Sequence, residues 1–409
     1  MLSDSGASLL EKVTEFAVGK TDPNKGLNEL RKHCSSERAR MLWDLALLRR
    51  RGKSKFGPDA ARMYFTRDGL EMASGAGPAA YHAGRFKALG RTHMIDLCCG
   101  IGGDAIAFAR AGMTVTMVDV NPLHLEYASA SAKALGLSSQ ISALEGDAAS
   151  PELIADLAQA HPDAGIWFDP ARRSSSSKRT VRPEDYVPPL SLLTMLASLH
   201  FPVAGIKLAP AIEHSVGFEY GANLEFLSHE GECKEGLLWL VQGQSHRPSP
   251  SAVVLKRDEI FVLDAIPNGQ FGTGRALSTG YLFEPDPAVI RAHLVQQLAA
   301  DLNAALIDPQ IAYLIGPNPI LSPFSECYPI MEKFTYSRRT LQDVINRHDV
   351  GRLIVKKRGV PVEPEDVISQ VKLKSGPERI VVITREGSTR VAYLCEKPLT
   401  ADTGSEGRE

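Results

Sequence analysis

The chain has 409 residues, 44% hydrophobic and 23% charged, with a formal net charge of −2 at pH 7, which is typical of a folded globular protein. No apolar run approaches the ~18–20 residues of a membrane span, and the first residues lack the apolar core of a signal peptide. The six cysteines are scattered without C-x-x-C spacing, which argues against a disulfide framework or a zinc site. We therefore expect a cytoplasmic protein of one to three domains that holds no metal.

Residues 1–90 are predicted to be a mainly helical, basic region, with a helical pattern over 26–50 that is interrupted near Ser35. Segment 31–67 holds 11 Lys/Arg against 3 Asp/Glu, a net charge of +8. Its basic residues alternate with aromatic ones, and such a pattern can hold phosphates and stack on unpaired bases. Lys55 is therefore a candidate nucleic-acid contact, although helix packing with a solvated rim explains the pattern equally well.

The next segment predicts a βαβ unit with a glycine-rich turn. The apolar run His93–Cys98 is expected to be a buried parallel strand, followed by Gly100 and Gly102, which allow a ligand to approach the backbone closely. Asp104 is expected to cap the following helix. A second apolar strand ends at Asp119, an acid placed to accept hydrogen bonds from ribose hydroxyls. The unit thus predicts a nucleoside site.

Strands and helices continue to alternate through residues 91–264. Further strands are predicted at Ile141–Leu144, Ala164–Phe168 and Pro202–Leu208, followed by closely spaced strands suited to an antiparallel edge. This alternation predicts a Rossmann-like, doubly wound α/β core with its ligand at the carboxyl ends of the strands.

The remaining chain predicts smaller units. Residues 265–330, rich in Pro and Gly, are expected to form a connector with its own small fold and one amphipathic helix, Pro287–Leu306. Residues 331–397 predict a small α+β domain, with 14 Lys/Arg against 9 Asp/Glu and a net charge of +5. Residues 398–409 are expected to be a disordered tail. The basic loop of the α+β domain supplies three candidate contacts to a polyanion: Lys356, Lys357 and Arg358.

The glycine-rich turn resembles a known motif. Asp96 to Asp104 reads D-x-x-x-G-x-G-G-D, and Ile106 stands where a dinucleotide-binding fingerprint would have its third glycine. The run resembles motif I of class I S-adenosylmethionine (SAM)-dependent methyltransferases, which implies SAM as cofactor with Asp96 near its methionine amino group. The cofactor-binding residues implied are Asp96, Cys98, Gly100, Gly102, Asp104, Asp119, Val120, Asp147 and Ala148.

A second motif follows the fourth predicted strand. Asp169-Pro170 resembles the start of the motif with which class I amino-methyltransferases orient an exocyclic amine toward the methyl group. Where that motif has an aromatic residue, two positions after Pro170, this chain has Arg172. An arginine side chain can stack on a base or bind a phosphate. The following loop is rich in cations and has no acid, which favours a phosphate-bearing acceptor. The candidate substrate contacts here are Arg172, Arg173, Lys178 and Arg179.

Together with a G-R-L-x-x-K-K-R-G segment (Gly351–Gly359), these motifs resemble bacterial class I methyltransferases that carry a C-terminal THUMP-like domain. The methyltransferase part is similar to trimethylguanosine synthase-type RNA guanine-amine methyltransferases. The resemblance implies RNA, either rRNA or tRNA, as the partner, and it names no particular nucleotide or oligomeric state.

The leading hypothesis is therefore methylation of a base amine in structured RNA, with Asp169, Pro170 and Lys207 as the catalytic candidates. A ribose 2′-hydroxyl methyltransferase is a second hypothesis, because Asp169 and Lys207 on consecutive strands supply two members of the Lys-Asp-Lys-Glu set that such enzymes use. The second lysine of the set would be Lys53 or Lys55, and the glutamate would be Glu232 or Glu235. The sequence is also compatible with a small-molecule methyltransferase and with a non-catalytic protein that binds SAM and RNA.

Overall fold

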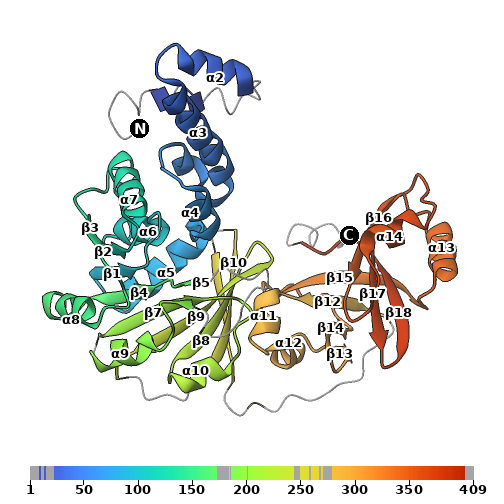
Figure 1. The fold of residues 1–409 in the computed structure, drawn as a ribbon. Coiled ribbons are helices and arrows are strands. Elements are labelled where there is room, and N and C mark those ends of the chain that lie inside the picture. The colour runs from blue at the N-terminus through green and yellow to red at the C-terminus, as the bar shows by residue number, and fades with distance from the viewer. Residues whose placement is uncertain are drawn as a thin grey trace, which may run out of the picture. The chain divides into compact units, whose positions relative to one another are not determined.

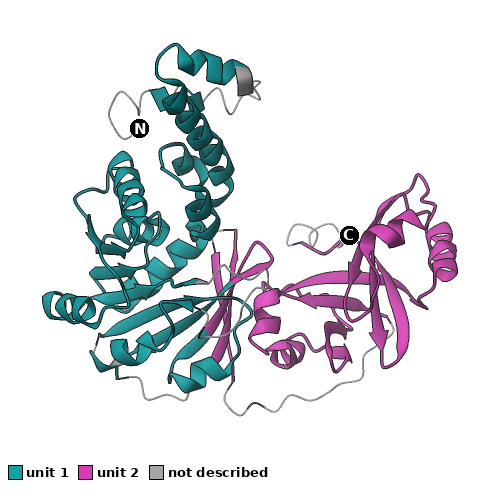
Figure 2. Ribbon diagram, in the orientation of Figure 1, with its two compact units in different colours: residues 1–224, 235–248 teal, residues 225–234, 249–409 magenta. Residues whose placement is uncertain are grey.

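The computed structural model describes residues 9–10, 13–14, 23–172, 184, 186–199, 201–243, 249–257, 259–266, 269 and 279–400. The chain divides into two compact units, residues 1–224 with 235–248 and residues 225–234 with 249–409 (Figure 2). No helix within the described ranges is both long enough and apolar enough to cross a membrane.

Unit 1 begins with helices. They are α2 (Pro23–Arg31), α3 (Ser36–Phe56), the 3-10 helix η1 (Gly57–Ala61), α4 (Arg67–Met72) and α5 (Ala76–Ala88). The interruption expected near Ser35 is confirmed, because the Ser35 side chain accepts a hydrogen bond from the Arg38 amide and caps α3. The buried side chains of α3 share a hydrophobic core with Ile106 and Tyr127, so this helical region packs onto the α/β core as part of the same unit.

The parallel sheet of unit 1 follows the predicted strands closely. Its strands are β1 (His93–Leu97), β2 (Thr114–Asp119), β3 (Ile141–Glu145), β4 (Gly165–Phe168), β7 (Val203–Leu208) and β9 (Glu232–Val241), of which β9 begins in unit 2. Their hydrogen-bonded order is β3-β2-β1-β4-β7-β9; the first five are parallel, and β9 is antiparallel to β7 (Figure 1). The Rossmann-like fold and its antiparallel edge are thus confirmed.

Helices and one short hairpin connect these strands. They are α6 (Gly103–Arg110), α7 (Pro122–Ala134), α8 (Pro151–Ala160), α9 (Leu192–Ser198), α10 (Ser215–Glu219) and the hairpin of β5 (Ala171–Arg172) with β6 (Tyr186–Val187). The strand order reverses between β1 and β4, which puts a ligand crevice beyond the carboxyl ends of these two strands. Both predicted motifs, at Asp96 and at Asp169, lie on these two strand ends.

One capping prediction in unit 1 was wrong. Gly102, in the left-handed conformation (φ 80°), is the N-cap of α6, and Asp104 lies within the first turn of that helix. The Asp104 carboxylate is hydrogen-bonded to His82 at 2.8 Å, so it is not available to cap the helix.

Unit 2 contains strands in the order β11-β10-β8, which are β8 (Asn223–His229, beginning in unit 1), β10 (Pro250–Lys256) and β11 (Glu259–Asp264). It also holds a seven-stranded sheet in the order β13-β14-β12-β15-β18-β17-β16. The strands of that sheet are β12 (Tyr281–Pro285), β13 (Ala305–Asp308), β14 (Ile311–Gly316), β15 (Ser325–Thr335), β16 (Arg352–Lys357), β17 (Glu378–Glu386) and β18 (Thr389–Cys395). Its helices are α11 (Pro287–Arg291), α12 (Val295–Asp301), α13 (Arg338–Arg347) and α14 (Pro364–Ser369).

The predicted boundary at residue 330 does not separate two folds. The long strand β15 pairs with β12 on one side and with β18 on the other, so the supposed connector and the C-terminal segment build one sheet. The expected helix Pro287–Leu306 is also two helices. His293 adopts a left-handed φ of 60°, and the amide of Leu294 donates to the carbonyl of Val289, a Schellman turn that ends α11 without the usual glycine.

Candidate active site

Three residues of the glycine-rich turn after β1 adopt the left-handed backbone conformation. Cys98, Gly100 and Gly102 have φ values of 62°, 54° and 80°. A side chain at Gly102 would lie 2.9 Å from the Cβ of Ala128 in α7, so both backbone conformation and packing require glycine there. At Gly100 a side chain would meet nothing within 4 Å, so the turn borders open space at this point.

Asp96, at the end of β1, is 1% exposed, and both of its carboxylate oxygens lack a hydrogen-bond partner among the described residues. Burial raises the pKa of this carboxyl well above its usual value, and the neighbouring Asp104 and Asp169 raise it further. A buried carboxylate without a partner is costly unless a ligand donates to it. Asp96 is therefore suited to a cationic donor group of a ligand in the crevice.

Asp119, at the end of β2, is held firmly. Its two oxygens accept from the amides of Gly100, at 2.8 Å, and Asn121, at 2.9 Å. Burial would raise the pKa of Asp119, but His124 and these amides lower it below its usual value, so the carboxylate is ionised. This anion borders the glycine turn, where its remaining lone pairs can accept hydroxyl groups of a ligand.

The other predicted cofactor contacts lie on the same edge. Val120 directly follows Asp119 and is 63% exposed. The amide of Gly146 donates to the carbonyl of Asp119, which brings the end of β3 alongside that of β2. Asp147 there is exposed and accepts from the Ala149 amide at 2.8 Å, and Ala148 is buried.

Asp169 and Lys207 form an ion pair at the ends of β4 and β7. Lys207 Nζ lies 2.7 Å from Asp169 Oδ2, 3.0 Å from Ser74 Oγ and 3.5 Å from the carbonyl of Met72. The three protons of the ammonium group therefore have three acceptors. The other carboxylate oxygen of Asp169 has no partner among the described residues, and the side chain is 27% exposed. The pair thus offers one fixed acceptor oxygen at the crevice.

Comparison with known proteins agrees with this geometry. Residues 91–182 match the family described as RNA cap guanine-N2 methyltransferase, and residues 325–397 match the THUMP domain-like family. The chain is 29% identical over 381 residues to an uncharacterized S-adenosylmethionine-dependent methyltransferase of Mycobacterium tuberculosis, covering 88% of this chain and 97% of the relative. This chain is an S-adenosylmethionine-dependent methyltransferase with a C-terminal THUMP-like domain. A crystal structure of a proposed methyltransferase from Porphyromonas gingivalis W83 shares the fold over 95% of this chain and 98% of its own, with a TM-score of 0.75 at 20% identity.

The crevice of the methyltransferase fits its cofactor. The unpartnered Asp96 suits the methionine ammonium group, and the ionised Asp119 suits the ribose hydroxyls. The Asp104 carboxylate, in contrast, is hydrogen-bonded to His82. Asp104 could therefore contribute to cofactor binding only by positioning α6, the helix that carries it. No cluster of His, Cys, Asp or Glu able to hold a metal ion occurs in the part of the chain that the structure describes.

Behind the crevice lies a buried cluster that sequence reasoning missed. His82 is fully buried, and its ring nitrogens lie 2.8 Å from Asp104 Oδ1 and 2.7 Å from Glu235 Oε1. Burial alone would lower the pKa of His82, but the two carboxylates raise it to about 9. His82 is therefore an imidazolium ion at neutral pH. His82 and Glu235 are 153 positions apart in the sequence, so their contact leaves no local signal.

Lys55 does not fit the predicted role of a phosphate contact. Its ammonium group donates to the carbonyls of Leu70, Glu71 and Ala73 at 2.8, 2.8 and 2.9 Å. These are carbonyls at the end of α4 that have no partner within that helix. Because all three donors are used, Lys55 is a structural cap, and that prediction is corrected.

Most of the other candidates for the ribose-methyltransferase set are bound to other groups. Glu235 is bound to His82, and Lys55 is bound to carbonyls of α4. Glu232 lies in unit 2 and pairs with Lys234 at 2.5 Å. Lys53 is exposed on α3.

The remaining candidate phosphate contacts fall into two groups. Near Asp169, Arg172 lies in the β5–β6 hairpin, where its backbone pairs with that of Tyr186. Arg173, Lys178 and Arg179 lie outside the described residues.

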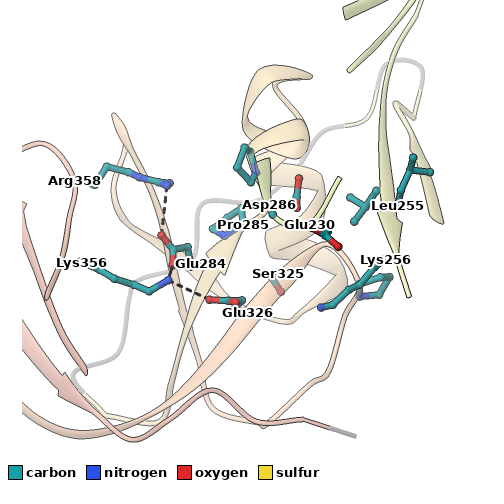
Figure 3. A pocket seen from close by; sticks show the side chains of 14 residues that line it. Glu230, Leu255, Lys256, Glu284, Pro285, Asp286, Ser325, Glu326, Lys356 and Arg358 are labelled. Atoms are coloured by element: carbon teal, nitrogen blue, oxygen red, sulfur yellow. Dashed lines mark hydrogen bonds and ion pairs between the residues drawn. The ribbon is translucent and has the colours of Figure 1, made fainter. Parts of the chain in front are cut away.

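In unit 2, the predicted basic loop is neutralised by acids of its own unit. Lys356 lies 2.5 Å from Glu284 and 3.1 Å from Glu326, and Arg358 lies 3.6 Å from Glu284. Figure 3 marks these ion pairs with dashed lines. Lys357 pairs with Glu363 at 2.6 Å. All three cations form ion pairs with acids of their own unit, so their contacts do not support the prediction that they hold phosphates.

Proposed function

We propose that this methyltransferase transfers the methyl group of SAM to the exocyclic amine of a base in RNA. The observation that carries the proposal is the Asp169–Lys207 pair, which holds one carboxylate oxygen fixed and leaves the other free at the crevice. SAM, when bound, supplies an electrophilic methyl group. The chain has to position the nucleophile.

Asp169 is suited to orient an amine. Its free oxygen can accept one N–H of the base amine and so turn the nitrogen lone pair away from the carboxylate and toward the methyl donor. Burial raises the pKa of Asp169 above its usual value although Lys207 opposes the rise. A carboxylate of raised pKa is also a better acceptor for the proton that the nitrogen loses once it is methylated. Pro170 follows directly and stiffens the chain that carries Asp169.

Lys207 argues against a ribose hydroxyl as the acceptor. A hydroxyl must lose its proton for attack, which requires an unprotonated general base or a cation that is free to lower the pKa of the hydroxyl. Burial opposes the charge on Lys207, but Asp169, Glu235 and Asp104 raise its pKa well above the usual value. Lys207 therefore stays protonated and all its donors are occupied. An amine can attack the methyl group before it loses its proton, so it needs no such activation, and for this reason we favour base methylation.

RNA as the acceptor is supported by the two family matches and by the cation-rich segment after Asp169. Tritiated SAM and RNA from cells lacking the protein, digested to nucleosides after reaction, test the proposal. Tritium in an N-methylated base supports it, and N-methylated guanine is the product that we expect from the family match. Tritium in a 2′-O-methylnucleoside would establish a ribose methyltransferase instead. Transfer only to a small molecule would establish a small-molecule methyltransferase, and SAM binding without any transfer would establish a non-catalytic protein; either result would refute the proposal.

A further inference from the structure

Ser74 lies in the short loop between α4 and α5, outside both segments that match known families. It is 5% exposed, and its carbonyl would lie 3.2 Å from a side chain placed at Gly103, the first residue of α6. The loop is therefore seated directly against the first turn of the helix that follows the cofactor-binding glycines.

The Ser74 hydroxyl joins two charged groups. It accepts a hydrogen bond from Lys207 Nζ at 3.0 Å and donates one to the carboxylate of Asp104. A hydroxyl can do both at once because it has one donor and two acceptor lone pairs. Ser74 thus connects the side of the crevice that holds Asp169 with the side that begins at the glycine turn.

The connection is part of a longer chain of contacts with alternating charge. From the acceptor side inward its members are Asp169, Lys207, Ser74, Asp104, His82 and Glu235. These residues come from the end of β4, from β7, the α4–α5 loop, α6, α5 and β9. Inside a protein, removing one member of such a chain leaves a neighbouring charge unpaired, so the members hold one another in place.

We propose that Ser74 is a positioning residue for methyl transfer, whose hydroxyl keeps the Asp169–Lys207 pair in register with the first turn of α6 and so with the cofactor. The inference rests on the proposed function, because it assumes that Asp169 orients the acceptor. In this role Ser74 acts through Lys207 and Asp104, not by contact with the methyl donor or the acceptor.

The test compares Ser74→Ala with Ser74→Thr, which keeps the hydroxyl. Ser131→Ala is the matched control, because Ser131 is a fully buried serine of the same unit whose hydroxyl also accepts one bond, from the Tyr64 amide, and donates one, to the Tyr127 carbonyl. We expect Ser74→Ala to lower kcat for transfer to RNA about tenfold, with the KM for RNA and the Kd for SAM within about threefold of wild type. Ser74→Thr should recover most of the rate, and Ser131→Ala should lower the melting temperature while keeping kcat. An unchanged kcat in Ser74→Ala, or an equal loss in Ser131→Ala, would overturn the proposal.

A second readout needs no acceptor and so separates failure of this inference from failure of the proposed function. The acylation rate of Lys207 by an N-hydroxysuccinimide ester is followed by mass spectrometry with SAM bound. Loss of one of its three acceptors should speed labelling of Lys207 several-fold in Ser74→Ala and leave the rate in Ser131→Ala unchanged. Equal labelling in all variants would refute the positioning role even if RNA methylation is established. Faster labelling with no transfer to RNA by the wild type would refute the proposed function alone.

Discussion

Asp169 and Lys207 lie 2.7 Å apart at the ends of neighbouring parallel strands, β4 and β7, and each fixes the other in a half-buried position. The pair combines an acceptor oxygen that is free for a substrate with a cation that is permanently charged. It therefore determines which chemistry the crevice can perform and how that chemistry depends on pH.

Replacing Lys207 with Met should move the acid limb of the pH–rate profile. Lys207 lowers the pKa of Asp169 against the effect of burial, so without it that pKa rises further. The carboxylate is then ionised only at higher pH, and we expect kcat to fall at neutral pH and to recover partly as the pH increases. The measurement is kcat between pH 5 and 9 for both proteins. A variant profile that runs parallel to that of the wild type would contradict the assignment.

Asp96→Asn should separate cofactor binding from stability. The amide has nearly the same shape but carries no charge to attract a ligand ammonium group, so the Kd for SAM should rise about tenfold or more. The free protein should melt at the same or a higher temperature, because an unpartnered buried carboxylate and its repulsion by Asp104 and Asp169 are removed. Calorimetric titration and thermal unfolding measure the two effects. The exposed Asp147→Asn is the control, for which a smaller change in affinity is expected; an unchanged Kd in Asp96→Asn would rule out its role.

The buried imidazolium of His82 should make stability depend on alkaline pH. Its pKa is raised from 6.5 to about 9 in the folded protein, so its contribution is fully present below pH 6.5 and is lost as the pH rises through about 9. The full loss corresponds to about 3 kcal/mol of unfolding free energy. Urea unfolding between pH 6 and 10 should show this decline, and a flat profile would contradict it. In His82→Gln the decline should vanish, whereas His161→Gln, a substitution outside the buried cluster, should retain it.

Lys55 and Lys53 provide a direct comparison of a structural and a solvated cation on the same helix. Lys55→Ala should cost about 1–3 kcal/mol of unfolding free energy, because three carbonyls at the end of α4 lose their donor. Lys53→Ala should change it by less than about 0.5 kcal/mol. Affinity for RNA, measured as a function of salt, should not fall more in Lys55→Ala than in Lys53→Ala. A larger loss, with a shallower salt dependence, would restore Lys55 as a phosphate contact.

The parts of the fold that the sequence predicted well are those with local signals. Apolar strands, the glycine-rich turn with Gly100 and Gly102 and the acids at strand ends could be read directly, because each depends on its immediate neighbours. The proximity of Asp169 and Lys207 followed from topology, since the ends of adjacent parallel strands meet at one edge.

What could not be predicted depends on contacts between distant segments. Ser74 and His82 show no motif, and their partners in α6, β7 and β9 meet them only in the folded chain. Lys55 belongs to a basic pattern on a helix, and that pattern does not reveal that unsatisfied carbonyls lie within its reach. The end of α11 was missed because His293 takes a left-handed conformation usually reserved for glycine.

The central claim, that Asp169 aligns a base amine for methyl transfer, is tested most directly by Asp169→Ala. Tritium transfer from SAM to RNA is measured for the wild type and the variant, together with the Kd for SAM by calorimetry. We predict that transfer falls below detection in the variant while its Kd for SAM stays within about threefold of the wild-type value. Transfer that survives the substitution at a rate near that of the wild type would contradict the account.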